Sequence, residues 1–173
     1  GIGTKRPLDA AELRAASLSG EIEDLIDWKP VRAGDYFYIP AGTVHAIGAG
    51  ITLVEVQQHA DITYRLFDYG RPRELHLDDG VAVSRAGSYT DLRHGNAVAG
   101  KSLVDGPFFR RPLPDDGTHW QRDGVTGPFG IAPTRGAAEV NGAIVNTGDC
   151  FLTSEIESLS IGMGALCLFA SAC

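Results

Sequence analysis

The sequence predicts a mainly β protein with a short helical segment at its N-terminus. Turn-forming residues are frequent, with 22 Gly and 9 Pro among 173 residues, which favours short strands separated by turns. Between these turns the apolar residues form runs of strand length. The N-terminal residues 1–30 instead carry helix start signals and helical apolar spacing. We therefore expect helices in residues 1–30 and strands in most of the chain that follows.

Two short helices are predicted in this lead-in segment. Asp9 followed by Glu12 has the pattern of a capping box at a helix start, and Gly20 ends that helix. The second helix has an apolar stripe made by Ile22, Leu25 and Ile26. Such a stripe packs one helix face against a core, and Pro30 then stops helical structure.

Strands are predicted on both sides of a polar middle region. The candidates before this region are Tyr36–Ile39, His45–Ile47, Ile51–Gln57 and Thr63–Tyr69. In Ile51–Gln57 both alternating faces are largely apolar, as in a strand covered on both sides. From residue 82 to residue 96, and again from 106 to 117, polar residues and prolines predict irregular connections.

The C-terminal part of the chain has the alternation of a second β region. Its strand candidates are Ala137–Val145, Asp149–Thr153, Leu159–Ile161 and Ala165–Ala170. Within the first of these, Asn141 and Gly142 predict a hairpin turn. Because this region has no histidine after His119, we interpret it as a structural half without a metal site.

Composition and charge exclude several classes of function. The net charge is −7 and the isoelectric point is about 5.1, which argues against a nucleic-acid partner. The longest apolar run is too short to cross a membrane, so we expect no membrane partner. The three cysteines lack metal-binding spacing, and Cys150 and Cys167 lie in apolar runs that predict buried free thiols. These features indicate the cytoplasm.

The most informative segment surrounds His45. An aromatic strand ends at Pro40 and Gly42, and the histidine follows directly. A turn of this kind is expected to aim the imidazole inward from a β scaffold, where it is a natural metal ligand. Glu55 and Arg65 follow at intervals of ten residues. A metal-ligand type, a carboxylate and a permanent cation therefore occur at successive strand-length intervals.

The run PAGTVHAIGAGITLVEVQQHADITYRLFDYGRPRELHL, residues 40–77, resembles the bacterial type I mannose-6-phosphate isomerases of the cupin superfamily. The resemblance implies a cupin-type double-stranded β-helix, or jelly roll. In this interpretation residues 1–30 are a helical lead-in and residues 31–100 are the barrel portion that carries the site. Residues 101–173 are then a degenerate, cupin-like second β half.

The resemblance also implies an activity in carbohydrate metabolism. The family interconverts mannose 6-phosphate and fructose 6-phosphate, an aldose–ketose isomerisation through an enediol(ate), so the expected partner is a small phosphorylated sugar. Its zinc is bound by a Gln-x-His pair, a Glu and the histidine that matches His45. Nothing before His45 matches the first three ligands. We therefore expect the chain to be a C-terminal portion of a longer enzyme, with the other zinc ligands upstream of Gly1. By itself it is expected to bind little or no zinc and to have doubtful activity.

Five residues are predicted to form the site. His45 is the metal ligand, and Arg65 matches an arginine that the family requires for catalysis. Glu55 is the second catalytic candidate, because the matching family glutamate lies inside the cavity. Asp61 and Gln57 are predicted to bind substrate. The identity of the catalytic base stays open.

Each assignment has a structural alternative. Glu55 could be a surface carboxylate, and Arg65 could form an ion pair with Asp61 or Asp68. Asp61 could serve only to position Arg65. In the segment GRPRELHL, residues 70–77, the arginines and the histidine are expected to make structural pairings.

A second function remains open, namely a catalytically silent cupin that binds sugar or serves in assembly. The missing zinc ligands favour it. An iron-dependent cupin oxygenase is poorly supported, because its facial triad needs two histidines and a carboxylate. The oligomeric state is not predicted.

Overall fold

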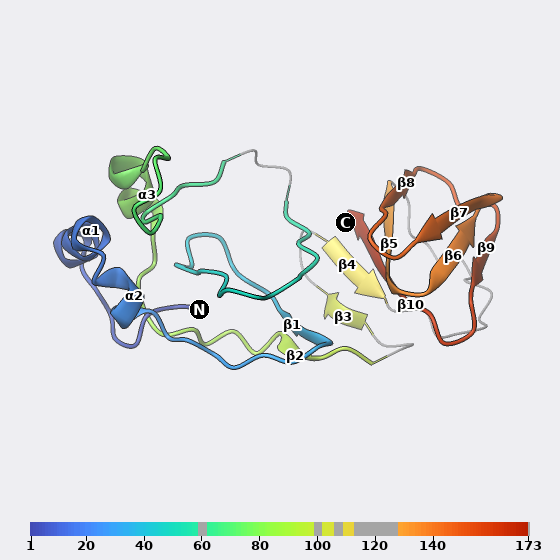
Figure 1. Ribbon diagram of the computed structural model, residues 1–173, viewed down its shortest axis with the longest axis horizontal. Helices are drawn as coiled ribbons and strands as arrows, with labels where there is room; N and C mark the ends of the chain where they lie inside the picture. Colours follow the sequence, from blue (N-terminus) through green and yellow to red (C-terminus); the bar gives the residue numbers. More distant parts are fainter. Residues whose placement is uncertain (59–61, 99–101, 106–108, 113–127, 173) are drawn as a thin grey trace. The chain divides into compact units, whose positions relative to one another are not determined.

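The computed structural model describes residues 1–58, 62–98, 102–105, 109–112 and 128–172 (Figure 1). The chain forms two compact units. The first unit comprises Gly1–Ala33 and Tyr38–Leu92, and the second comprises Gly34–Phe37 and Arg93–Cys173. The division into residues 1–30, 31–100 and 101–173 stays a prediction.

The first unit contains the helices. They are α1 (Ala10–Ser19), α2 (Ile22–Leu25) and α3 (Leu77–Val83). The predicted capping box is present, because the Asp9 carboxylate accepts the Glu12 N–H at 2.8 Å and Glu12 accepts the Asp9 N–H at 3.0 Å. Gly20 ends α1 in the left-handed conformation, with φ of 86°, as is common after helices. Both helices predicted from the sequence are confirmed, whereas α3 was not predicted.

A small apolar core holds the helices of the first unit together. Its buried members are Leu13, Ala16, Ile22, Ile26 and Val44, and Leu66, Phe67 and Val81 pack against them. Gly80 lets α3 pack closely against Leu66, because a Cβ on Gly80 would lie 2.9 Å from Leu66 Cδ2. None of the helices in the described part of the chain is long and apolar enough to cross a membrane.

Three strand predictions in the first unit are wrong. The described residues of His45–Ile47, Ile51–Gln57 and Thr63–Tyr69 contain no strand, and His45 makes only an isolated bridge to Ile2. Ile51, Leu53 and Val54 of the second of these segments are exposed rather than covered on both faces. A strand needs a hydrogen-bonded neighbour, and no described strand pairs with these segments.

The second unit contains all the strands that the described residues form, and every pair is antiparallel. The first pair is β1 (Asp35–Phe37) with β2 (His94–Asn96). A five-stranded sheet has the order β3 (Ser102–Asp105), β4 (Phe109–Pro112), β10 (Leu166–Ala172), β5 (Phe129–Arg135) and β8 (Phe151–Thr153). A three-stranded sheet has the order β7 (Ala143–Asn146), β6 (Ala137–Val140) and β9 (Leu159–Ile161).

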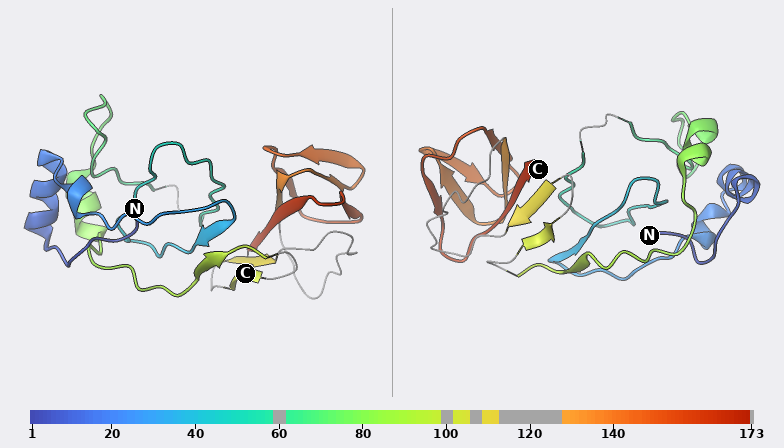
Figure 2. Two further views of the ribbon diagram at one scale, coloured as in Figure 1. Left: turned by 60° about the horizontal axis from the view of Figure 1, so that its bottom comes forward. Right: turned by 180° about the vertical axis from the view of Figure 1, so that it is seen from behind.

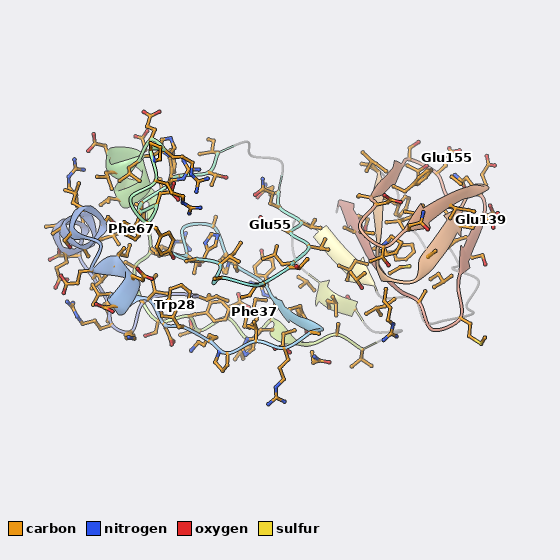
Figure 3. The ribbon with its side chains drawn as sticks, in the orientation of Figure 1. Trp28, Phe37, Glu55, Phe67, Glu139 and Glu155 are labelled. Carbon is orange, nitrogen blue, oxygen red and sulfur yellow. The ribbon has the colours of Figure 1, made fainter. Side chains whose placement is uncertain are left out.

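The two larger sheets share one apolar core, and Figure 2 shows them from two further directions. Ile131 and Phe169 come from the five-stranded sheet, and Val140 and Val145 come from the three-stranded sheet. Burial alternates along β6, where Glu139 is exposed between buried neighbours (Figure 3). This alternation is the pattern of a sheet with one covered face.

The prediction of a mainly β protein is confirmed. The C-terminal strand predictions are confirmed within one or two residues at most ends, including the hairpin at Asn141 and Gly142, where φ is 50° and 79°. Among the described residues the strands form three separate sheets and no closed barrel. Strands β2 and β4 lie where irregular connections were predicted. Cys167 is a buried free thiol as predicted, but Cys150 is exposed.

Candidate functional site

The turn before His45 is fixed by close backbone contacts. The Thr43 N–H donates to the Pro40 carbonyl at 3.1 Å, and the Arg85 N–H donates to the Gly42 carbonyl at 2.7 Å. Gly42 has φ of 83°, and a Cβ there would lie 2.7 Å from the Val83 carbonyl oxygen. Only glycine meets both conditions without strain. This position therefore anchors the His45 segment to the chain that follows α3.

His45 itself is exposed, so the predicted inward orientation is not observed. Its Nδ1 lies 2.9 Å from the Thr43 carbonyl oxygen. Because a carbonyl oxygen only accepts hydrogen bonds, Nδ1 is the donor in this contact, and in the neutral imidazole Nε2 then keeps its lone pair. A histidine oriented in this way can supply one bond to a metal ion.

The described residues do not form a zinc site by themselves. Within the described ranges no group of three or more His, Cys, Asp or Glu side chains is placed to hold a metal. A catalytic zinc usually takes three protein ligands and a water. His45 is therefore one candidate ligand, and the described residues do not complete a group of three ligands around it.

Glu55 lies in the irregular segment that follows His45 (Figure 3). It is exposed, and it makes no hydrogen bond or ion pair with any described residue. The expected inward strand face is therefore absent at this position. Gln57 is also exposed, and Asp61 lies outside the described residues.

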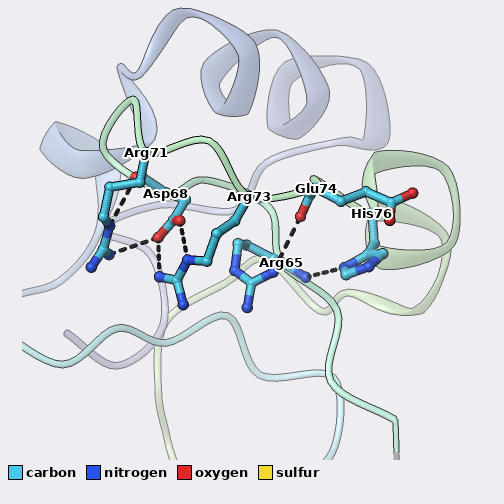
Figure 4. Close-up of polar contacts among 6 residues, drawn as sticks. All are labelled: Arg65, Asp68, Arg71, Arg73, Glu74 and His76. Carbon is cyan, nitrogen blue, oxygen red and sulfur yellow. Dashed lines mark hydrogen bonds and ion pairs between the residues drawn. The ribbon is translucent and has the colours of Figure 1, made fainter.

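Two hydrogen bonds with His76 hold the backbone N–H and carbonyl groups of Arg65. The Arg65 N–H donates to His76 Nδ1 at 3.0 Å, and the His76 N–H donates to the Arg65 carbonyl at 2.8 Å. The guanidinium Nη1 donates to the Glu74 carbonyl at 3.2 Å (Figure 4). No described carboxylate forms an ion pair with this guanidinium. The ion pair with Asp68 considered from the sequence is therefore not formed.

Asp68 is a buried carboxylate between two arginines (Figure 4). Arg71 Nη2 donates to Oδ1 at 2.6 Å, and Arg73 donates to both carboxylate oxygens through Nε and Nη2. These hydrogen bonds, those of Arg73 above all, lower the pKa of Asp68 below its ordinary value. The same contact raises the pKa of Arg73. The structural pairing expected for these arginines is confirmed.

The sequence reasoning missed the partners in these contacts. Asp68 was considered only as a partner of Arg65, although its spacing to Arg71 and Arg73 places three charges within six residues. This local concentration of charges could have predicted the ion pairs from the sequence alone. The contact between His76 and Arg65 spans eleven residues of irregular chain, and no sequence period predicts it.

The predicted catalytic trio is not joined by direct contacts. Among the described residues no hydrogen bond or ion pair links His45, Glu55 and Arg65. All three belong to the first unit. Their convergence on one substrate cavity stays a prediction.

The fold is of the cupin type. The structure matches the crystal structure of the mannose 6-phosphate isomerase from Bacillus subtilis with a TM-score of 0.65. The match covers 99% of this chain and 58% of that chain, at 24% sequence identity. The cupin-type fold class predicted from the sequence is confirmed, although the described strands close no barrel.

Sequence comparison identifies more specific relatives. The chain is 38% identical over 108 residues to the mannose-6-phosphate isomerase of Streptococcus mutans, a match over 57% of this chain and 34% of that protein. It is 47% identical over 78 residues to a mannose-6-phosphate isomerase of Bacillus subtilis, over 42% of this chain and 25% of that protein. No family model matches the chain. The predicted resemblance to the type I mannose-6-phosphate isomerases is thus confirmed, while the match spans only a quarter to a third of these relatives' lengths.

Proposed function

We propose that the protein acts in the interconversion of mannose 6-phosphate and fructose 6-phosphate. The observation that carries this proposal is the identity of up to 47% with proteins named mannose-6-phosphate isomerase. The cupin fold agrees with it. Because the matched relatives are much longer than the match, the activity of the whole enzyme is part of the proposal.

Arg65 is the residue that we assign to the reaction with the strongest structural support. Isomerisation through an enediol(ate) develops negative charge on the carbonyl oxygen, and a fixed cation lowers the energy of that state. Its backbone is fixed by His76 and its Nη1 by Glu74, while its guanidinium has no ion-pair partner among the described residues. Such a guanidinium remains available to a substrate.

The remaining site residues are assigned by the same proposal. Glu55 relays a proton or holds a sugar hydroxyl, which requires a carboxylate within hydrogen-bond reach of the substrate. Its lack of a partner among the described residues is compatible with that role. Gln57 and Asp61 bind the sugar.

Zinc enters the proposal through His45 alone. Its Nε2 supplies one bond, and the other ligands come from residues outside the described set. Bound zinc supplies electrostatic stabilisation to a sugar carbonyl. The described residues do not complete a zinc site by themselves.

The same proposal covers location and organisation. We place the protein in the cytoplasm, since Cys150 and Cys167 are free thiols and structural disulfides are rare there. We propose the same three parts as predicted from the sequence, namely a helical lead-in in residues 1–30, a site-bearing portion in residues 31–100 and a β half in residues 101–173.

The direct test is an isomerase assay and a zinc analysis on the natural gene product. Conversion of mannose 6-phosphate to fructose 6-phosphate, with zinc at one ion per site, would support the proposal. Failure to convert either sugar phosphate in the presence of zinc would overturn it.

Arg65→Ala tests the assignment within an active protein. Its turnover number should fall roughly 100-fold or more, because a charge-stabilising donor is lost, while the circular dichroism spectrum and zinc content stay the same. Arg135→Ala is a matched control, since Arg135 also donates to one backbone carbonyl, that of Gly164, at 2.8 Å. The control should keep its turnover, and an active Arg65→Ala protein would remove the assignment.

A second candidate is a catalytically silent cupin that binds a sugar or serves in assembly. The lack of a metal-binding group among the described residues favours it. Binding of mannose 6-phosphate without turnover and without zinc would support this alternative over the enzyme.

A further inference from the structure

Three guanidinium groups lie around one carboxylate in the first unit. Asp68 forms ion pairs with Arg71 and Arg73, and the positive charge of Arg65 also acts on Asp68. Figure 4 shows the three arginines on the same side of the segment. One negative charge cannot balance three positive ones, so the cluster formed by Arg65, Asp68, Arg71 and Arg73 keeps an excess of positive charge. An excess of this kind attracts anions.

Arg71 and Arg73 are held in fixed positions. The Asp68 side chain is only 5% exposed and binds the Nε and Nη2 groups of Arg73 and the Nη2 group of Arg71. Arg71 also donates from Nε to the Asp68 carbonyl at 3.3 Å, and its guanidinium carbon lies 5.7 Å from the centre of the Tyr69 ring. Side chains ordered in advance lose less entropy when a ligand binds. Asp68 is thus a positioning residue for both guanidiniums.

The outward edges of both guanidiniums remain accessible. The side chains of Arg71 and Arg73 are 58% and 48% exposed, although their partner is buried. Each has N–H groups, including both on Nη1, that donate to no described residue. A fixed pair of guanidinium edges matches the oxygen atoms of a phosphate group.

Among the described residues, Asp68 is the only carboxylate that forms an ion pair with these arginines. Asp78 forms an ion pair with Arg14. The Glu74 side chain makes no ion pair with any described residue, and it is the backbone carbonyl of Glu74 that contacts Arg65. The excess positive charge therefore stays with the cluster.

We propose that Arg71 and Arg73 bind the phosphate group of a phosphorylated sugar, with Asp68 holding them in place and Arg65 beside them. The choice of a sugar phosphate rests on the proposed function, whereas recognition of a phosphate group rests on the cluster itself. Anchoring the phosphate there directs the sugar carbons toward Arg65. The arginines of GRPRELHL then have both a structural and a ligand-binding role.

Titration of the whole chain with inorganic phosphate, followed by NMR at constant ionic strength, tests the site. Saturable binding is expected, with the signals of residues 64–76 shifted most. Arg71→Gln and Arg73→Gln should each weaken the affinity by about tenfold or more, because a charge-assisted contact is lost. Arg71→Gln is the safer variant for folding, since Asp68 keeps Arg73. Arg14→Gln is the matched control, an ion-paired arginine of the same unit outside the cluster, and should not change the affinity.

The outcomes separate this inference from the proposed function. No saturable phosphate binding, or an equal loss in Arg14→Gln, overturns the site. In an active protein, Arg71→Gln should raise KM for mannose 6-phosphate by about tenfold with a smaller change in kcat, and an unchanged KM overturns the inference while leaving the isomerase intact. Phosphate binding without isomerase activity overturns the proposed function and leaves the phosphate site standing.

Discussion

The C-terminal strands and the segment Ile51–Val54 have similar apolar residues but different structures. In the second unit, Ile131 and Val140 are completely buried in paired strands. In the first unit, Ile51 and Leu53 are 43% and 47% exposed and lie in no strand. The difference is the presence of a partner, because strand propensity expresses packing against neighbours more than a preference of the backbone.

In the second unit, local turns bring neighbouring strands together so that they can pair. Asn141 and Gly142 adopt the positive φ angles of a tight hairpin, which places β6 and β7 in register. After His45, the turn at Ala49 and Gly50 leads to no paired strand among the described residues. An unpaired apolar segment of this kind is a template for pairing with another strand.

The largest expected contrast between the two regions is in hydrogen exchange. The amides of Ile51–Val54 make no hydrogen bond to a described residue, whereas β5 and β10 pair along most of their lengths. Exchange from the central β10 amides should be slower by roughly 1,000-fold or more, because exchange there requires local or global opening. Amide exchange measured by mass spectrometry or NMR gives both rates. Comparable protection in the two regions would mean that Ile51–Val54 is paired with a strand in solution.

A core substitution should show the same contrast in stability. Phe169→Ala removes a side chain that is 2% exposed between the two sheets, so the free energy of unfolding should fall by about 3–5 kcal/mol. Leu53→Ala, the matched truncation in the unpaired segment, should cost less than about 0.5 kcal/mol. Urea denaturation followed through NMR signals of each unit measures both. A large loss for Leu53→Ala would show that its side chain is covered in solution.

Features encoded by neighbouring residues were predictable from the sequence. The capping box of Asp9 and Glu12 and the hairpin at Asn141 and Gly142 depend on positions at most three residues apart. Their conformations are therefore decided by local sterics and hydrogen bonds. The mainly β class followed from the same short-range signals repeated along the chain.

Features that depend on distant chain segments were not predictable in the same way. Strand β5 contains Pro133, which usually argues against a strand within a sheet. Here Pro133 lies opposite Cys167 next to an irregularity in the register at Leu166 and Cys167. Helix α3 contains Gly80, which lowers helix propensity but gives room for Leu66. In both cases a tertiary contact outweighs the local preference.

The candidate site also has some features that neighbouring residues determine and others that depend on distant segments. The types of its residues were readable from the motif around His45, but their placement was inferred from strands that the described part of the chain does not contain. Glu55 was assigned to an inward face, and face assignments fail when a strand is absent. The Asp68 ion pairs were within reach of sequence reasoning, because all their members lie within six residues.

The smallest expected effect is on the melting temperature of the first unit, which contains no described strand and is stabilised in part by the ion pairs of Asp68. Asp68→Asn keeps the size of the side chain but removes the charge that faces Arg71 and Arg73. The two guanidiniums then lose their counter-charge, so the melting temperature of the first unit should fall by several degrees at neutral pH. Asp78→Asn, which removes an exposed ion pair with Arg14, is the control and should change it far less.

The pH dependence of this effect follows from the direction of the Asp68 pKa shift. An aspartate in an unfolded chain has a pKa of about 4, and in the folded protein the hydrogen bonds from Arg73, followed by the charges of the arginines, lower the pKa of Asp68. The ionised carboxylate therefore stabilises the folded state above about pH 4, and this contribution is lost as the pH falls through the lower folded-state pKa. Melting curves of the natural chain and Asp68→Asn should differ most above about pH 5 and converge in stronger acid. A difference that stays constant from neutral pH into strong acid would show that the asparagine acts through packing, and that charge pairing does not stabilise this unit.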